Sequence, residues 1–465
     1  MKHLPFFLMC ALGSALAQTA ADRARFEQLA AQGEAPAQFN LGVIYENGLG
    51  VAKDDAKAFQ WYEKAAAQGL AKAQLNLALM YAKGAGVAKD ERKAAEWAAK
   101  AAAQGDPEAQ FIMGTICAAG RGVEKDERKA AEWMEKSAES GKPMAQFLLG
   151  RMYSEGRGVA RDPGKALQWI GKAAAQALPD AQLMLGAMCL EGRGVARDEA
   201  KGIEWITKAA NQGFARAQFD LGVMHATGRG FPKDDAKAAQ WYEKAAAQGF
   251  APAQFNLGLV YSQGRGVFKN QAQAVRFFEQ AAEQGNAAAQ LNLGYIHEQG
   301  LGVAIDYAKA VEWFEKAAVQ GEPAAQFNLG VALETGRGRP KDEATAAEWF
   351  RKSAAQGLAP AQLSLGLMYR DGRGVAKDAA RAAGLFGKAA LQGNVRAQIQ
   401  FAACCANGEG LPRNPALACA WYSIAAAKGN VGAQRSRDEL DRSLTPEQKA
   451  ETLKLLEQIL AKIGR

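Results

Sequence analysis

Histidine and cysteine, the residues that most often act in catalysis or bind metals, are scarce in this sequence. The chain of 465 residues holds three histidines and six cysteines, so few side chains could act as a general base or bind zinc. Long apolar runs are also missing, because outside the first 17 residues no stretch approaches the roughly 18 apolar residues of a membrane-spanning helix. These absences argue against a metalloenzyme and against a membrane span in the mature chain.

Residues 1–17 have the pattern of a secretory signal peptide. Lys2 precedes an apolar run over residues 4–12, and Ala15 and Ala17 place small residues at the two positions that a signal peptidase inspects. We expect cleavage after Ala17, which predicts a secreted or periplasmic protein.

A pattern of 36 residues then repeats eleven times without an insertion or deletion. The pair Ala37-Gln38 returns as Ala73-Gln74 and recurs at every period up to Ala397-Gln398. We number the positions of each copy from 1 to 36, with Ala35 at position 1. Such regularity predicts a solenoid, in which no copy can bury its apolar face alone and each packs on its neighbours.

The first half of each copy has the spacing of an amphipathic helix, here named helix A. In copy 1, Ala37, Leu41 and Ile44 recur at three- and four-residue intervals. The helix should end at Gly48, since glycine at this position in all eleven copies can adopt the left-handed conformation. A second invariant glycine, Gly50 in copy 1, predicts a tight turn.

The second half of each copy predicts helix B. Asp54 can cap its first turn, and aspartate or asparagine occupies this position in every copy. The helix should end at Gly69. The nine tryptophans all stand at position 27 in its centre, and we expect them in the core: Trp61, Trp97, Trp133, Trp169, Trp205, Trp241, Trp313, Trp349 and Trp421.

Four motifs connect these features to a known family. A-x-A-Q-x-x-L-G-x-x-Y, G-x-G-V-x-K-D, K-A-x-x-W and K-A-A-x-x-G are present in residues 35–69. They recur in residues 251–285 with Phe277 for tryptophan, Asn270 for aspartate, and Gln273 and Gln280 for lysine. They resemble the Sel-1-like repeat, a relative of the tetratricopeptide repeat. The resemblance implies an all-α fold: a right-handed superhelical α-solenoid of eleven 36-residue helix-turn-helix repeats. It also implies a scaffold that binds a protein or peptide, not an enzyme, and no cofactor.

The unbroken period predicts one elongated domain, since no linker interrupts residues 35–430. Residues 18–34 match the second half of a copy and should form a capping half-repeat. Residues 431–465 begin a partial copy and end in a capping helix, whose start at Thr445 has a capping-box sequence. We expect its apolar stripe to cover the last copy, with dimerisation or membrane-surface binding as the alternative; the stripe is Leu453, Leu456, Leu460 and Ile463.

Most histidines and cysteines of the mature chain share position 11, where Tyr45 stands in copy 1. They are Cys117, Cys189, His225, His297 and Cys405. Equivalent positions in adjacent copies should lie about 10 Å apart, too far to share a zinc ion with bonds of about 2 Å. We therefore interpret them as variants of one core position and expect no metal site.

An envelope hydrolase acting on β-lactams or peptidoglycan is an alternative function. Some secreted relatives of this repeat carry a regular cysteine pair in each copy, and penicillin binding or hydrolysis has been proposed for them. Here the regular pairs are missing, and only Cys404 or Cys405 could pair with Cys419. No Ser-x-x-Lys motif with its partner residues is visible.

The candidate binding surface is the face of helix A that carries positions 2, 6, 9 and 13. At position 6 the array has a polar segment, whose amides could bind a peptide backbone, and an apolar segment. The polar residues are Asn256, Asn292 and Asn328, and the apolar residues are Ile112, Leu148 and Met184. The alternative is that the polar side chains are merely solvated and the apolar ones pack between copies.

A basic ridge is the other candidate surface, on a chain whose net charge is +8. Arginine stands at position 15 in seven copies: Arg121, Arg157, Arg193, Arg229, Arg265, Arg337 and Arg373. The ridge could bind an anionic polymer, or its charges could be solvated and partly neutralised by the capping aspartates. Nucleic acid is not expected, because the ridge lacks interleaved aromatic residues. The oligomeric state stays open.

Overall fold

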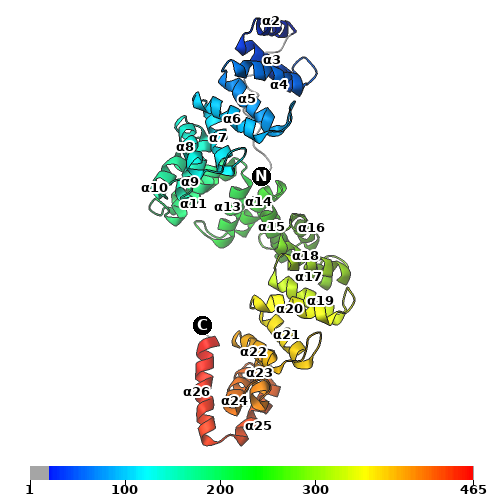
Figure 1. Cartoon of the computed structure of the whole chain (residues 1–465). Coiled ribbons are helices and arrows are strands. Elements are labelled where there is room, and N and C mark those ends of the chain that lie inside the picture. The colour runs from blue at the N-terminus through cyan, green and yellow to red at the C-terminus, as the bar shows by residue number, and fades with distance from the viewer. Residues whose placement is uncertain (1–19, 464–465) are drawn as a thin grey trace. The chain divides into compact units, whose positions relative to one another are not determined.

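The computed structural model describes residues 20–463, which form 25 helices and no strand within that range. Figure 1 traces them in chain order, from α2 (Ala20–Ala31) in blue, at the place of the predicted capping half-repeat, to α26 (Pro446–Ile463) in red. Helix A of the eleven copies is α3 (Ala35–Asn47), α5 (Ala71–Lys83), α7 (Pro107–Ala119), α9 (Pro143–Glu155), α11 (Pro179–Glu191), α13 (Ala215–Thr227), α15 (Ala251–Gln263), α17 (Ala287–Gln299), α19 (Pro323–Thr335), α21 (Ala359–Asp371) and α23 (Val395–Asn407).

Helix B of the copies is α4 (Asp55–Ala67), α6 (Glu91–Ala103), α8 (Glu127–Glu139), α10 (Pro163–Ala175), α12 (Glu199–Asn211), α14 (Asp235–Ala247), α16 (Gln271–Glu283), α18 (Tyr307–Val319), α20 (Glu343–Ala355), α22 (Ala379–Leu391) and α24 (Pro415–Ala427). Contacts within a copy, such as α3 with α4, alternate with contacts between neighbouring copies, such as α4 with α5. The predicted all-α repeat fold is confirmed. The signal peptide predicted for residues 1–17 lies outside the described residues.

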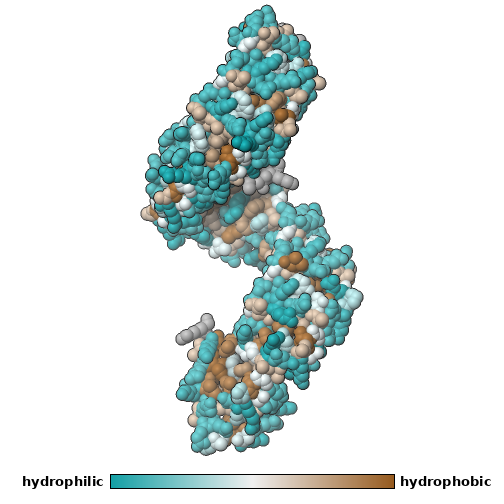
Figure 2. Space-filling model, viewed as in Figure 1, coloured by the Kyte–Doolittle hydropathy of each residue, from teal (hydrophilic) through white to brown (hydrophobic). Residues whose placement is uncertain are grey.

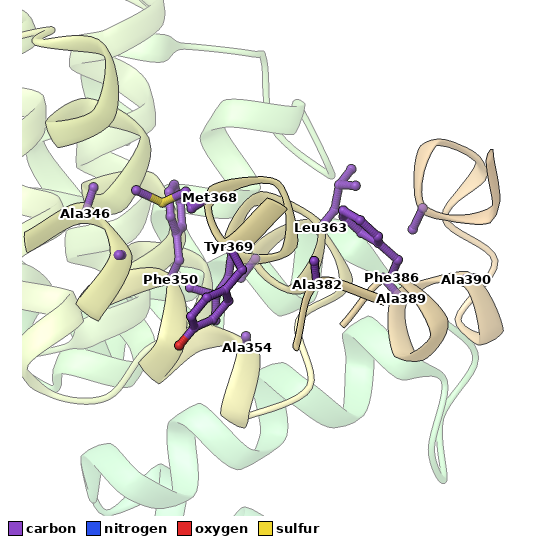
Figure 3. Packing of buried hydrophobic residues seen from close by; sticks show 14 of the residues in the cluster. Ala346, Phe350, Ala354, Leu363, Met368, Tyr369, Ala382, Phe386, Ala389 and Ala390 are labelled. Carbon is purple, nitrogen blue, oxygen red and sulfur yellow. The ribbon is translucent and has the colours of Figure 1, made fainter. Parts of the chain in front are cut away.

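The chain divides into two compact units, one ending at Leu221 and one beginning at Gly222. This differs from the single domain that the unbroken period predicts, and each unit has its own buried clusters. Figure 3 shows one cluster of the second unit, in which Phe350 and Phe386 lie among buried side chains of copies 9 and 10.

The predicted caps define the helix boundaries. In copy 1, Gly48 follows α3 with a φ of 68°, and the Asp54 carboxylate accepts a 2.9 Å hydrogen bond from the Lys57 amide. The same side-chain cap begins helix B in all eleven copies, with Asn270 and Asn414 in place of aspartate. These amides need an acceptor because the first turn of a helix offers none.

Glycine at position 16 allows neighbouring copies to approach closely. A Cβ atom at Gly86 would collide with the backbone of Asp55 at the start of helix B in the preceding copy. Gly50 follows no complete copy, and nothing lies within 4 Å of a Cβ built there. The turn of each copy therefore packs on the start of the preceding helix B.

The tryptophans are not the centre of the core, and that prediction was wrong for eight of the nine. These eight side chains are half-buried. The next residue, at position 28, is the fully buried one; examples are Tyr62, Phe278 and Phe350. Lysine at position 30 places its ammonium 3.8 to 4.4 Å from the centre of each of these eight rings. The indole thus lies at the edge of the core, where a cation can cover its face.

Trp421 is the exception, because position 30 of its copy holds Ile424 and both side chains are buried. Copy 11 therefore has a wider core than the others.

A hydrogen-bonded glutamine network also runs through the buried layer of the array. At position 4, Gln74 donates from Nε2 to the carbonyl oxygen of Ala66 in the preceding copy at 3.2 Å.

The Oε1 atom of Gln74 in turn accepts a 2.8 Å hydrogen bond from Gln104 at position 34. The same hydrogen bond, at 2.7 to 2.9 Å, joins the two glutamines in copies 1, 4, 5, 7, 8, 9 and 10. The sequence marked each copy by its Ala-Gln pair, but it did not predict this network.

The C-terminal segment forms α25 (Val431–Ser443) and α26 (Pro446–Ile463). The predicted capping box is present, because Thr445 and Gln448 exchange hydrogen bonds of 3.0 and 3.3 Å. Helix α26 packs on α24 of the last copy. The predicted stripe is confirmed at Leu456 and Ile463, which pack on the core of the last copies. It is wrong at Leu453, which is 65% exposed, and at Leu460, which is also exposed, so its phase is shifted. The contacting side chains are Thr452, Leu455, Leu456, Ile459 and Ile463.

Candidate functional site

The three asparagines of the polar segment lie at the same position of α15, α17 and α19, but their amides differ in what they contact. Each is half-buried, close to the preceding copy. The side chain of Asn256 hydrogen-bonds with the hydroxyl of Tyr242. Burial of the Tyr242 side chain raises the pKa of its phenol. Asn292 donates from Nδ2 to the carbonyl oxygen of Ala288 in its own helix at 2.8 Å. Both amides therefore already have partners.

Asn328 is different, because its Nδ2 is buried and has no hydrogen-bond partner. The side chain of Phe314, which is at position 28 of the preceding copy, has no hydroxyl to pair with it. Asn328 lines a small cavity of about 20 Å³ together with Glu298, Thr335 and Arg337. A cavity of this size can hold about one water molecule, so the amide has room to meet one polar atom from outside the protein.

The apolar segment on α7, α9 and α11 is engaged between copies. Ile112, Leu148 and Met184 are half-buried and pack against the buried cluster of the first unit. Position 28 of the preceding copy is apolar there, as in the case of Met134 before Leu148. In these three copies the side chains at positions 28 and 6 are therefore both apolar at the junction.

The outer part of the helix-A face is more open than position 6. Position 13 is exposed in the copies of the polar segment, which carry Gln263, Gln299 and Thr335 there. At position 9, Tyr295 is also exposed. This rim offers amide, hydroxyl and phenol groups that could hydrogen-bond with a polar ligand.

The positive charges of the basic ridge are partly neutralised. The neutralising carboxylates are mainly not the capping aspartates that the sequence suggested. The ridge also includes the lysine or arginine that stands just before the helix-B cap, at position 19, in ten copies. This residue pairs with an acid at position 21, as in Lys89 with Glu91 and Lys341 with Glu343, both at 2.8 Å. Among the position-15 arginines, Arg157 lies 3.7 Å from Glu127 of the preceding copy. The signal for this pairing was present in the sequence as the acid that directly follows many caps.

The histidines and cysteines at position 11 are all buried, as predicted for a core position. The five cysteines among the described residues are free thiols, and neither Cys404 nor Cys405 is bonded to Cys419. Burial raises the pKa of the Cys405 thiol to about 12, which makes it a poor nucleophile.

Within residues 20–463, no group of three or more histidine, cysteine or acidic side chains could hold a metal ion. No helix in that range is long and apolar enough to cross a membrane.

The comparison with protein families decides the identity of the repeat. The family model described as Sel1 repeat matches eleven times, at residues 35–70, 71–106, 107–142, 143–178, 179–214, 215–250, 251–286, 287–322, 323–358, 359–394 and 395–430. The chain belongs to the Sel1 repeat family. The matched boundaries coincide with the 36-residue copies, so the resemblance inferred from the sequence motifs is confirmed.

Two solved structures are similar to this Sel1 repeat chain. One is c5321, a protective antigen of uropathogenic Escherichia coli with an SLR fold, at 35% identity and a TM-score of 0.72 over 95% of both chains. The other is a Sel1 repeat protein from Oxalobacter formigenes, at 39% identity and a TM-score of 0.53 over 65% of this chain and 88% of that chain. The comparison with curated proteins gave no match. The Sel1 repeat is a scaffold fold that commonly mediates protein–protein interaction.

Sequence reasoning missed one exposed group of residues, on the turns of copies 7 and 8. Phe268 is 97% exposed, and Leu301, Ile305 and Tyr307 are exposed as well. The signal was available, because Leu301 and Ile305 stand where most other copies carry a basic residue.

Proposed function

We propose that this Sel1 repeat protein is an exported scaffold without enzymatic activity, which binds a protein or peptide partner on the helix-A face. The signal-peptide pattern of residues 1–17 supports export to the periplasm or the exterior. The similarity to c5321, which is described as a protective antigen, agrees with a location that antibodies can reach. A β-lactam or peptidoglycan hydrolase gains no support from the buried thiols or from the dispersed histidines.

The unpaired amide of Asn328 carries this proposal. A buried donor without an acceptor destabilises a folded protein, because the group loses its hydrogen bonds to water and gains none in return. A backbone carbonyl of a bound peptide would supply the missing acceptor. The exposed groups of Tyr295 and Thr335 flank the same stretch of α17 and α19 and would contact the peptide on either side.

The test compares two variants of the mature protein as bait for proteins from its native envelope. Asn328→Ala should reduce retention of the specific partner by about tenfold, the cost of one hydrogen bond to a buried group. Its melting temperature should stay the same or rise, since the variant removes an unpaired donor. Asn292→Ala is the matched control at the same position one copy earlier. Its amide already bonds to its own helix, so we expect a smaller loss. Equal retention by wild type and both variants would exclude this face as the binding site.

The basic ridge supports a second candidate, the binding of an anionic polymer. Arg229 and Arg265 are exposed, and neither has a carboxylate within ion-pair distance in residues 20–463. Charge reversal of both should then weaken binding more than Asn328→Ala does, and most strongly at low salt, where exposed charges are least screened. Binding that is indifferent to salt and to charge reversal excludes the ridge.

A further inference from the structure

Copies 7 and 8 carry an apolar surface on their turns that no other pair of copies has within residues 20–463. Phe268 precedes α16 and is 97% exposed, and Ile305 precedes α18 and is 57% exposed. Their neighbours Leu301 and Tyr307 are exposed too. We name these four side chains the turn patch. Figure 2 shows that the visible face is mostly hydrophilic, with small brown apolar areas at several places.

The residues of the turn patch replace small or charged residues of the other copies. Position 18, that of Phe268, otherwise holds alanine, proline or glutamate, and position 19, that of Ile305, is lysine or arginine in the other ten copies. Neither residue is required by the repeat, whose turns form without them. Large apolar side chains left in water at adjacent turns indicate an interaction surface.

The turn of copy 8 lies against the start of α16, which directly follows the turn of copy 7. A Cβ atom at Gly302, beside Leu301, would lie 2.7 Å from Cβ of Gln271, three residues after Phe268. The next turn continues the surface, because the guanidinium of Arg337 lies 5.1 Å from the ring centre of Tyr307. The patch is therefore bounded by the turn of copy 7 on one side and the turn of copy 9 on the other.

Both boundaries are basic. Copy 7 contributes Arg265 and Lys269, and its helix B begins with Asn270 and Gln271 instead of the usual acids. Lys269 consequently lacks the carboxylate that pairs with its equivalents, and forms no ion pair with any described residue. Copy 9 contributes Arg337, while its Arg339 and Lys341 are paired with Glu315 and Glu343. The carboxylate of Asp306, within the patch, accepts a 3.0 Å hydrogen bond from the Lys309 amide as the cap of α18.

This charge pattern selects among possible occupants. A second copy of the chain, related by a two-fold axis through the patch, would bring basic boundaries against basic boundaries, which opposes association. Beside Phe268 there is a shallow, open hollow lined by Tyr261, Val267 and Lys269, which an apolar side chain of a partner can contact.

We propose that the turn patch binds an acidic segment of a partner protein that carries bulky apolar side chains at its centre. The apolar side chains contact Phe268 and Ile305 and enter the hollow, while the flanking carboxylates pair with Lys269 and Arg265 on one side and with Arg337 on the other. This surface consists of turns and does not include the helix-A face, so it stands independently of the helix-A function proposed above, although it shares Arg265 and Arg337 with the basic ridge.

A synthetic peptide probes the site: a fluorescein-labelled segment with three glutamates on each side of a Leu-Phe-Leu centre. Fluorescence anisotropy with the full mature chain should show saturable binding that weakens as salt is raised. The double variant Phe268→Ser with Ile305→Ser should weaken binding by about tenfold or more, as expected for central apolar contacts. Lys269→Ser should weaken it by a smaller factor and reduce its salt dependence.

Matched controls keep the result decisive. Val319→Ser removes a comparably exposed apolar side chain at the far end of α18 and should leave binding unchanged. A peptide with serines at its centre, or with lysines in place of the glutamates, should not bind. The proposal is overturned if the acidic peptide does not bind, if the double variant binds it like the wild type, or if the patch variants abolish binding to phosphatidylglycerol vesicles or self-association instead.

Discussion

At the scale of single residues, one hydrogen bond of the glutamine network is missing from copy 3. Position 34 holds Ser140 there, and Oε1 of Gln110 is buried without a partner. Copy 11, with Lys428 at position 34, has the same defect at Gln398. The two unsatisfied oxygens thus occur where the donating glutamine is replaced.

Ser140→Gln should restore the hydrogen bond of copy 3. The new Nε2 would donate to Gln110, and the variant should gain about 1 kcal/mol of unfolding free energy, measured by urea denaturation. Ser140→Glu has a side chain of the same length that can only accept, so it should give no gain. Equal stability of the two variants would contradict this account of the network.

At the scale of the helix, the aspartate caps connect stability to pH. Hydrogen bonding from the Lys129 amide lowers the pKa of the Asp126 carboxyl below its ordinary value of 3.8. The same direction holds for Asp54, Asp198, Asp234 and Asp342. A group with a lowered pKa in the folded state stabilises the protein above its unfolded pKa, and this contribution is lost as pH falls through the folded pKa.

Asp126→Asn should therefore change the pH profile more than the fold. Asparagine caps helix B with the same geometry at Asn270. The melting temperature of the wild type should fall relative to that of the variant as the pH drops below about 4, and the two curves should converge. A constant difference between wild type and variant from pH 7 to pH 3 would show that the Asp126 charge does not contribute.

The elements also show how far the sequence alone could lead. Helix ends and caps were predictable because glycine and aspartate act on their own backbone. Which of Trp349 and Phe350 faces the core was not predictable, since adjacent positions of a helix differ by only about 100° and the covering lysine lies one turn away. The phase of α26 was wrong for the same reason. At the binding face, helix A was predictable from the sequence. The hydrogen-bond partner of Asn256 was not, because Tyr242 belongs to the preceding copy and the 36-residue period does not show which side chains meet between copies.

At the scale of the whole molecule, each copy contacts mainly its neighbours, so damage should stay local. Stability in such arrays is approximately a sum of terms from each repeat and its nearest neighbours. Phe350 is fully buried in the second unit, and Phe350→Ala should cost about 3 to 5 kcal/mol as a large-to-small core change. Trp349→Ala, at the adjacent half-buried position, should cost less, because part of the indole already contacts water and the Lys352 side chain.

Hydrogen exchange followed by mass spectrometry can show which variant loses more protection and which helices are affected. In Phe350→Ala, amides of α18 to α22 should lose protection, whereas those of the first unit, up to Leu221, should exchange as in the wild type. Trp349→Ala should affect the same helices to a smaller extent. A larger effect of Trp349→Ala would restore the tryptophans as the centre of the core. Loss of protection throughout both units would mean that the copies unfold as one cooperative body, because nearest-neighbour terms alone cannot carry the change from copy 9 to the first unit.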